Sequence, residues 1–175
     1  AFSKDAEPVR KISIIPRGLA AGYTLKTPTE ERRIRRKSEF LAEMATLLGG
    51  YCAEILKFGE MSTGASSDLE RATDLAKRLV MDYGMSSLGP ITFGKKEELV
   101  FLGVKEVYRD FSEKIAEKID KEIEKFVKTA QDNAMDILRK KKRILETLAH
   151  TLMEKETIEK EEFEMIIGKS KKART

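Results

Sequence analysis

The sequence predicts a mainly α-helical bundle with a small β-strand element near its N-terminus. Two observations support this fold class. Apolar residues recur at three- and four-residue spacing through most of the chain after position 38, whereas β-prone runs are confined to residues 9–26. With 41% hydrophobic residues in 175, the chain has enough apolar side chains for one sizeable core. We therefore expect a single domain over residues 1–168, followed by a basic tail at 169–175.

The strand region holds two short runs, "ISII" and "YTLK", within residues 9–26. Pro16, Gly18 and Gly22 separate the runs, and proline and glycine mark turns. The pattern predicts a hairpin-like strand pair with a long connection. The polar stretch "TPTEERRIRRK" that follows is predicted to be a loop.

A first helical region extends from Ser38, the expected N-cap, to about Phe58. Gly49 and Gly50 each cost a helix about 1 kcal/mol relative to alanine, so we expect them to permit the close approach of another backbone. The helical periodicity is carried by Phe40, Leu41, Met44, Leu47, Leu48, Cys52, Ile55 and Leu56.

The next helix is expected to begin at a capping box formed by Ser67 and Glu70 and to end at Gly84, so that helices cover residues 38–84. Residues 85–110 give mixed signals. Ser112 is the expected cap of a long helix, followed by an apolar-periodic stretch at 144–152 and a short helix from Glu161 to Ile167. The C-terminal helices thus occupy residues 112–168.

Charge argues against a nucleic-acid partner. The 34 basic and 30 acidic residues leave a net charge of +4, and the two signs are interleaved as on solvated helix faces. Three basic clusters, "RRIRRK" at 32–37, "RKKKR" at 139–143 and "KSKKAR" at 169–174, have the charge to bind phosphates. Their positions favour helix surface or loop for the first two and a frayed tail for the third.

The single cysteine, Cys52, excludes an internal disulfide and is typical of a reducing compartment. Its apolar neighbours favour a buried structural thiol over a nucleophile. No apolar run reaches the roughly 20 residues that span a bilayer, and no signal peptide opens the chain, so the fragment is expected to be soluble. The start at Ala1 without methionine suggests a processed product or a piece of a longer protein.

Few residues are available for catalysis. The only histidine, His150, lies in an amphipathic stretch and is interpreted as a helix-surface or core-edge residue. One histidine and one cysteine cannot build a four-ligand structural zinc site. The stretch "PRGLAAG" matches neither phosphate-binding fingerprint, so no nucleotide is assigned to it.

Asp68 in "STGASSDLERAT" has two explanations that the local residues leave open. An acidic residue in the first helical turn is favoured by the helix dipole by roughly 0.3 to 1 kcal/mol, which accounts for the aspartate without a ligand. The loop before it, Thr63 to Ser66, is small enough to let another element come close to the carboxylate.

Four segments in order resemble the peptidase domain of the FtsH family of membrane-anchored, ATP-dependent zinc metalloproteases. They are "ISIIPRGLAAGYTL", "LLGGYCAEILKFGEMSTGASSDLERATDLAKRLVMDYGMSSLGPITFG", "VFLG" and "LMEKETIEKEEF". The resemblance covers nearly the whole chain. It implies an aspartate ligand for zinc, and Asp68 occupies that place; Glu54 matches a glutamate expected close to the metal without binding it.

The same resemblance implies that two further zinc ligands and a glutamate base belong to a His-Glu-x-x-His helix that is expected just upstream of Ala1. The chain would then hold one of three protein ligands. ATP would be used only by an ATPase module that this sequence does not contain. Tyr51-Cys52 also departs from the usual Arg-Ala of the family, which leaves one local packing contact in doubt.

Two hypotheses follow from the resemblance. The chain is either the greater part of a zinc endopeptidase domain or a catalytically silent helical assembly module of the same ancestry. The first implies unfolded polypeptide substrates and a homo-hexamer, with this domain on the cytoplasmic side of the membrane, or in the matrix or stroma of an organelle. A strand of residues 9–26 either pairs with substrate by β-augmentation or only covers the core.

Overall fold

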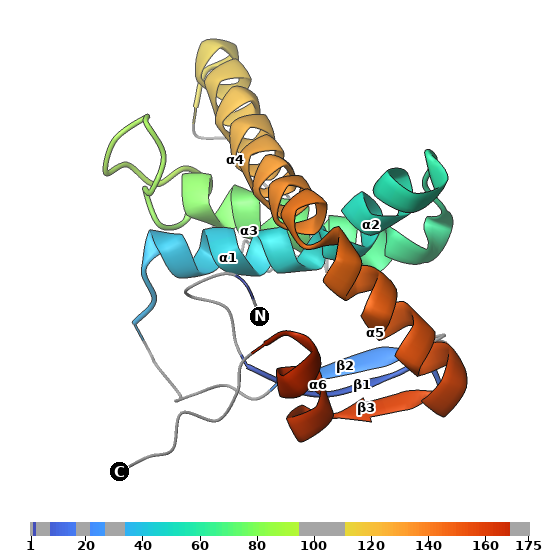
Figure 1. Ribbon diagram of the computed structural model, residues 1–175. Coiled ribbons are helices and arrows are strands. Elements are labelled where there is room, and N and C mark those ends of the chain that lie inside the picture. Colours follow the sequence, from blue (N-terminus) through green and yellow to red (C-terminus); the bar gives the residue numbers. More distant parts are fainter. Residues whose placement is uncertain (1, 3–7, 17–21, 27–33, 95–110, 169–175) are drawn as a thin grey trace, which may run out of the picture. The chain divides into compact units, whose positions relative to one another are not determined.

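The computed structural model describes residues 2, 8–16, 22–26, 34–94 and 111–168 of the chain (Figure 1). It is mainly helical, with six α-helices and a small antiparallel sheet among these residues, and the predicted fold class is confirmed. The chain divides into two compact units, one formed by residues 1–35 and 136–175 and the other by residues 36–135. The single domain over 1–168 stays a prediction.

The first unit is built around a three-stranded antiparallel sheet. Strands β1 (Val9–Ser13) and β2 (Tyr23–Lys26) form the predicted pair, and their register shifts between Val9 and Lys11. A third strand, β3 (Thr157–Glu159), pairs with the other edge of β1, which gives the order β2-β1-β3. No pattern in the sequence predicts β3, because three residues are too few to show alternation.

Two helices cover this sheet and supply its core. Helix α5 spans Lys142–Lys155, and α6 spans Lys160–Ile166 (Figure 1). The buried side chains of this unit are Ile158, Phe163 and Ile167, and they pack with Val9, Ile12, Ile144, Leu148, Leu152 and Ile166. Residues from the two ends of the chain therefore meet in one apolar cluster.

The second unit contains α1 (Lys37–Leu47), α2 (Gly49–Phe58), α3 (Ser66–Met81) and the larger part of α4 (Glu113–Lys140). Helix α1 packs against α3, and the Phe40 and Tyr83 rings lie 5.4 Å apart. Small buried residues on α3 and α4 permit close helix packing. The buried apolar side chains of the unit are Phe40, Ala42, Met44, Leu47, Leu48, Cys52, Ala65, Ala72, Ala76, Leu79, Val80, Ile119, Phe126, Ala130 and Ala134.

The helix expected over 38–58 is two helices, because the chain turns at Leu48. The N-cap of α1 is Arg36 rather than Ser38, and the backbone N–H of Arg36 donates to Glu39 Oε2 at 2.9 Å. The expected close approach at Gly49 and Gly50 is also wrong for the described residues, since an added Cβ would meet no neighbouring atom within 4 Å. Both glycines belong to the first turn of α2, directly after the turn at Leu48.

The chain after α3 folds back over that helix in residues 82–94. The N–H of Met85 donates to the carbonyl of Leu79, and the N–H of Phe93 donates to the carbonyl of Met81, both at 2.9 Å. Gly84 has φ +59°, in the left-handed region. Glu122 of α4 holds the same segment, because its Oε2 accepts the Ser87 N–H at 2.9 Å.

Gly84→Ala is expected to destabilise the protein by about 2 kcal/mol. An alanine Cβ would lie 3.1 Å from the Ile91 nitrogen and 3.2 Å from the Pro90 Cα, and both are backbone atoms that cannot easily move away. Gly50→Ala is the control, since open space and a helical backbone should leave it neutral or up to about 1 kcal/mol more stable. Urea unfolding measures both, and an equal loss in the two variants would contradict this prediction.

Glu122→Gln is expected to lower the free energy of unfolding by about 1 kcal/mol at pH 7, the difference between a charge-assisted and a neutral hydrogen bond. The backbone bond from Ser87 lowers the pKa of Glu122 below its ordinary 4.5. A lowered pKa contributes stability above pH 4.5 that is lost as pH falls through the folded-state value. The gap between wild type and variant should therefore narrow as pH falls below 4.5, whereas the exposed control Glu124→Gln should change the free energy of unfolding little at pH 7.

Candidate functional site

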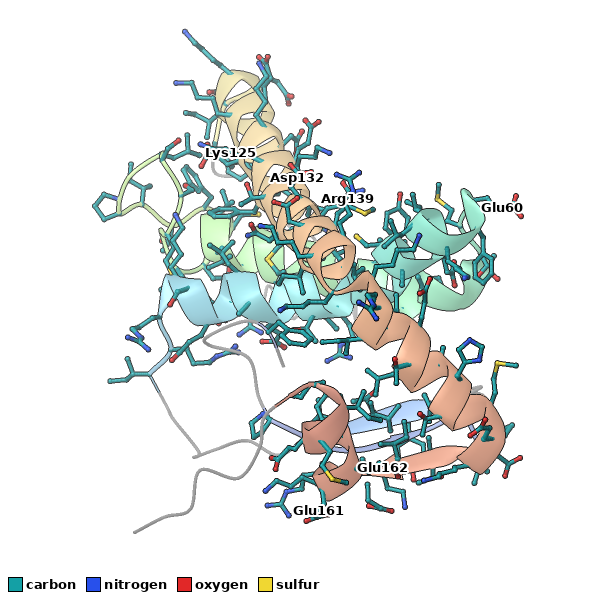
Figure 2. All side chains as sticks on the ribbon, in the orientation of Figure 1. Glu60, Lys125, Asp132, Arg139, Glu161 and Glu162 are labelled. Atoms are coloured by element: carbon teal, nitrogen blue, oxygen red, sulfur yellow. The ribbon has the colours of Figure 1, made fainter. Side chains whose placement is uncertain are left out.

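The connection between α2 and α3 carries the residues that the sequence singled out. Helix α2 ends at Phe58, and Gly59 follows with φ +79° and donates its N–H to the Ile55 carbonyl at 3.0 Å. Glu60 marks the outer tip of the connection (Figure 2). A left-handed residue directly after a helix is the common way to end it, so the chain reverses here within a few residues.

Both carboxylate oxygens of Glu54 bind one residue of this connection. Glu54 Oε2 accepts the backbone N–H of Ser62 at 2.7 Å, and Glu54 Oε1 accepts the Ser62 hydroxyl at 3.0 Å. Charge-assisted bonds of this kind are about twice as strong as neutral ones. We call this pair of hydrogen bonds the Glu54–Ser62 bracket. Because Glu54 lies on α2, the bracket fastens the connection to the helix that precedes it.

Ser62 in turn begins the turn that leads into α3. Its hydroxyl oxygen accepts the Gly64 N–H at 3.2 Å and caps a 3-10 turn at Thr63–Ala65. A Cβ on Gly64 would lie 3.2 Å from that oxygen, so a small residue is favoured there. Helix α3 follows at Ser66, one residue earlier than expected, and the predicted capping box of Ser67 and Glu70 does not form.

Asp68 lies in the first turn of α3 with its side chain 46% exposed. Its contact among the described residues is an ion pair with Arg71, in which Oδ1 and Nη1 are 3.8 Å apart. A half-exposed i,i+3 pair at that distance is a weak interaction. The carboxylate therefore keeps an oxygen available to an external partner, as a metal ligand requires.

Among the described residues, the connection offers one candidate metal ligand, Asp68. No three His, Cys, Asp or Glu side chains gather to hold a metal ion in the part of the chain that the structure describes. Both oxygens of Glu54 accept a hydrogen bond from Ser62, so this carboxylate is engaged in fixing the connection. The structure brings Asp68 and Glu54 to the same connection, with Glu54 acting on the loop that precedes Asp68.

The other candidates from the sequence have structural places. His150 is exposed on α5, in the other unit, as expected of a helix-surface residue. Cys52 is fully buried, and its Sγ donates to the Gln131 carbonyl at 3.7 Å. Burial raises the pKa of the Cys52 thiol, which disfavours the reactive thiolate, and the predicted burial of this side chain is confirmed.

Ser62 is the residue of this site that the sequence did not single out. The small loop is interpreted there as a way to admit another element, whereas Ser62 is the anchor through which Glu54 fixes that loop. A signal was present, because a serine two residues before a glycine, ahead of a helix, is typical of a side-chain-capped turn. The acidic partner, eight residues earlier on a helix, has no local signature.

One exposed carboxylate beside an anchored loop does not by itself define a class of protein, whereas comparison with known families does. The family described as "Peptidase family M41" matches residues 1–166. The chain therefore belongs to peptidase family M41, the family of the FtsH ATP-dependent zinc metalloproteases.

The chain is similar over most of its length to proteins named "ATP-dependent zinc metalloprotease FtsH". It is 48% identical to one from Pseudothermotoga lettingae over 93% of the chain, and 45% identical to one from Thermotoga maritima over 94%. A relative from Acidobacterium capsulatum is 43% identical over 95%. The chain spans about a quarter of these relatives, 26%, 27% and 26% of their lengths respectively. No helix in the described ranges is long and apolar enough to cross a membrane.

Glu54→Gln is expected to loosen the connection without unfolding the unit. The variant keeps the size of the side chain but loses the charge that strengthens both bonds to Ser62, so amide hydrogen exchange at Ser62 and Gly64 should accelerate at least about tenfold, equivalent to roughly 1.4 kcal/mol. Glu60→Gln, an exposed change at the tip of the same connection, should leave these rates unchanged. Equal exchange rates in the two variants would show that the bracket does not hold the loop.

Proposed function

We propose that the chain is the greater part of the proteolytic domain of a zinc-dependent endopeptidase and that Asp68 is one of its metal ligands. One observation carries the proposal: an aspartate with an available oxygen stands at the end of a connection that Glu54 fastens to α2. Family membership and the printed names of the relatives support the metal and the reaction class.

Zinc, when bound, would polarise the peptide carbonyl as a Lewis acid. Asp68 would contribute one anionic oxygen, and the first turn of α3 would fix the direction of that carboxylate. Glu54 would act as a positioning residue, because it holds the loop that sets where α3 begins. Two histidine ligands and the glutamate base are expected from a His-Glu-x-x-His helix upstream of Ala1 in the parent protein.

The substrate class inferred for this reaction is unfolded polypeptide. Strand β1 is paired on both sides, by β2 and β3, so it has no free edge for another strand. Strand β2 is paired to β1 on one side only among the described strands, and Leu25 on it is exposed. If an extended peptide adds to a strand of residues 9–26, β2 is therefore the strand that can receive it through backbone hydrogen bonds, which suits broad sequence specificity.

In the parent protein we expect a homo-hexamer, a separate ATPase module and a membrane anchor, with this domain on the cytoplasmic, matrix or stromal side. The relatives' names include ATP dependence, and the chain spans about a quarter of their length, which leaves room for such modules. The alternative function is a catalytically silent assembly module of the same family. The residues that precede Ala1 in the parent distinguish the two, because only an endopeptidase needs the His-Glu-x-x-His helix.

Asp68→Asn, made in the parent protein, is expected to lower zinc content and casein degradation by orders of magnitude while the fold survives. A neutral amide oxygen is a poor replacement for an anionic metal ligand. If Asp68 were only a first-turn residue, the loss of its negative charge would lower the free energy of unfolding by about 0.3 to 1 kcal/mol and leave activity unchanged. Bound zinc is measured by elemental analysis after dialysis, and the fold by circular dichroism.

Asp74→Asn is the matched control. Asp74 lies on the same helix, is exposed, and pairs with Lys77 at i,i+3, with Oδ1 and Nζ 3.6 Å apart, much as Asp68 pairs with Arg71. It should therefore report the cost of losing such a carboxylate where no metal is involved. If Asp68→Asn retains zinc and activity to the same extent as Asp74→Asn, Asp68 is an ordinary first-turn residue.

A further inference from the structure

Two large apolar side chains stand exposed on the α2–α3 connection. Phe58, the last residue of α2, is 72% exposed, and Met61, which follows within the connection, is 58% exposed. We call these two residues the apolar pair. Glu60 lies between them in the sequence and is exposed at the tip of the connection (Figure 2). Solvent therefore reaches two apolar side chains and a carboxylate within residues 58–61.

Local packing does not account for the apolar pair. The Phe58 ring has no aromatic or cation contact with a described residue, whereas Tyr83, another exposed aromatic residue of this unit, has its ring 5.4 Å from that of Phe40. A helix that ends at a left-handed glycine usually places an apolar contact at the residue directly after that glycine. That residue is the charged Glu60, and Met61 lies one position further along. Neither member of the pair is thus needed to end α2.

The backbone that carries the apolar pair is fixed at both ends. Phe58 belongs to α2, whose last turn is closed by the Gly59 N–H on the Ile55 carbonyl. Met61 directly precedes Ser62, which the Glu54–Ser62 bracket holds. Side chains presented from an ordered backbone lose less conformational entropy when they bind a ligand. The apolar pair is therefore better prepared for binding than apolar residues on a loosely held loop.

The apolar pair also lies close to the proposed metal ligand. Ser62 has an extended backbone, Thr63–Ala65 form a 3-10 turn, and Asp68 is in the first turn of α3. This path keeps the Cα atoms of Met61 and Asp68 within about 20 Å of each other. About six residues of extended peptide cover the same span. A peptide that runs from Asp68 toward the connection would therefore reach the pair with a residue near its cleaved bond.

The chemistry of the pair favours an apolar side chain as its ligand. An unfolded polypeptide, the substrate class inferred above, exposes the apolar side chains that a folded protein buries. Phenylalanine offers a large rigid contact area, and methionine adapts its shape to what it touches. The exposed carboxylate of Glu60 repels an acidic side chain at the same place. Residues such as leucine fit this surface best.

We propose that Phe58 and Met61 form a subsite for one apolar side chain of the substrate, within about six residues of the cleaved bond. The subsite rests on the proposed function, because its position is defined by the bond that the endopeptidase cleaves. Backbone pairing with β2 would accept any side chain. The apolar pair adds selectivity to that binding, since it favours a stretch of chain that carries an apolar residue at the right distance from the metal.

Paired peptides test this subsite in the parent protein. The two peptides of a pair differ at one position, which carries leucine in one and serine in the other, and the pairs cover about six positions on each side of the cleaved bond. Mass spectrometry identifies that bond. The ratio of kcat/KM between the leucine and the serine peptide measures selectivity at each position.

Three double variants separate the subsite from other effects. Phe58→Ser with Met61→Ser, the serine variant, removes the apolar pair. Phe58→Leu with Met61→Leu, the leucine variant, changes its shape but keeps it apolar. Met153→Ser with Met165→Ser is the matched control, because these methionines are also exposed and belong to the first unit. Elemental analysis measures bound zinc in each variant, and circular dichroism checks the fold.

In the wild type and the control, we expect leucine to be preferred over serine by at least about tenfold at one or more positions. The serine variant should lose most of that preference. Its kcat/KM for the serine peptide and its bound zinc should stay within about twofold of wild type, because only the contact to the apolar side chain is removed. The leucine variant should keep most of the preference, since an apolar surface remains.

Two outcomes would overturn the subsite and leave the proposed function intact. In the first, the serine variant keeps the wild-type ratio at every position, and a lowered Tm would then assign the pair to a contact within the parent protein. In the second, it cleaves both peptides more slowly by the same factor, which indicates a structural role. If the wild type cleaves no peptide, or if Asp68→Asn retains zinc and cleavage, the proposed function fails and the subsite with it.

Discussion

The placement of Asp68 depends on one interaction, the pair of hydrogen bonds from Ser62 to Glu54. The α2–α3 connection is short, polar and largely exposed, so it has little apolar burial to order it. A carboxylate that accepts both the backbone N–H and the hydroxyl of one residue replaces that burial with directed bonds. Removing Glu54 would leave the start of α3 to be set by the 3-10 turn alone, and removing the Ser62 hydroxyl would also remove the cap of that turn.

The same two hydrogen bonds explain how Asp68, the proposed metal ligand, can be held in place at an exposed position. A ligand must be reachable by the ion and by substrate, so it cannot be held by being buried. Here α2 contributes the fixed end, since Cys52 on it packs into the core and Glu54 on it faces the connection. The packed core thus fixes the position of α2, and Glu54 and Ser62 in turn fix the loop that precedes the exposed Asp68 carboxylate.

The helices could be predicted from the sequence, because their apolar stripes run over many turns, as in α4 with Ile119, Phe126 and Ala130. The split at Leu48 could not, since the apolar pattern continues through it and glycines are tolerated in either arrangement. Strand β3 owes its conformation to pairing with β1, 148 positions away at Lys11–Glu159, rather than to its own three residues. The local sequence pattern around Asp68 was enough to single that residue out. The role of Ser62 could not be predicted in the same way, because its partner, Glu54, lies on the preceding helix.

The single cysteine gives the second unit a natural reporter. Cys52 has no exposed surface, and its raised pKa keeps the thiol protonated near neutral pH, so a thiol-reactive reagent can reach it only when the helices around it separate. The rate of alkylation therefore reads out how often that core opens, without any introduced label. Because no other thiol competes, the same measurement in a long parent protein would be assigned directly to this unit wherever the remaining chain lacks cysteine.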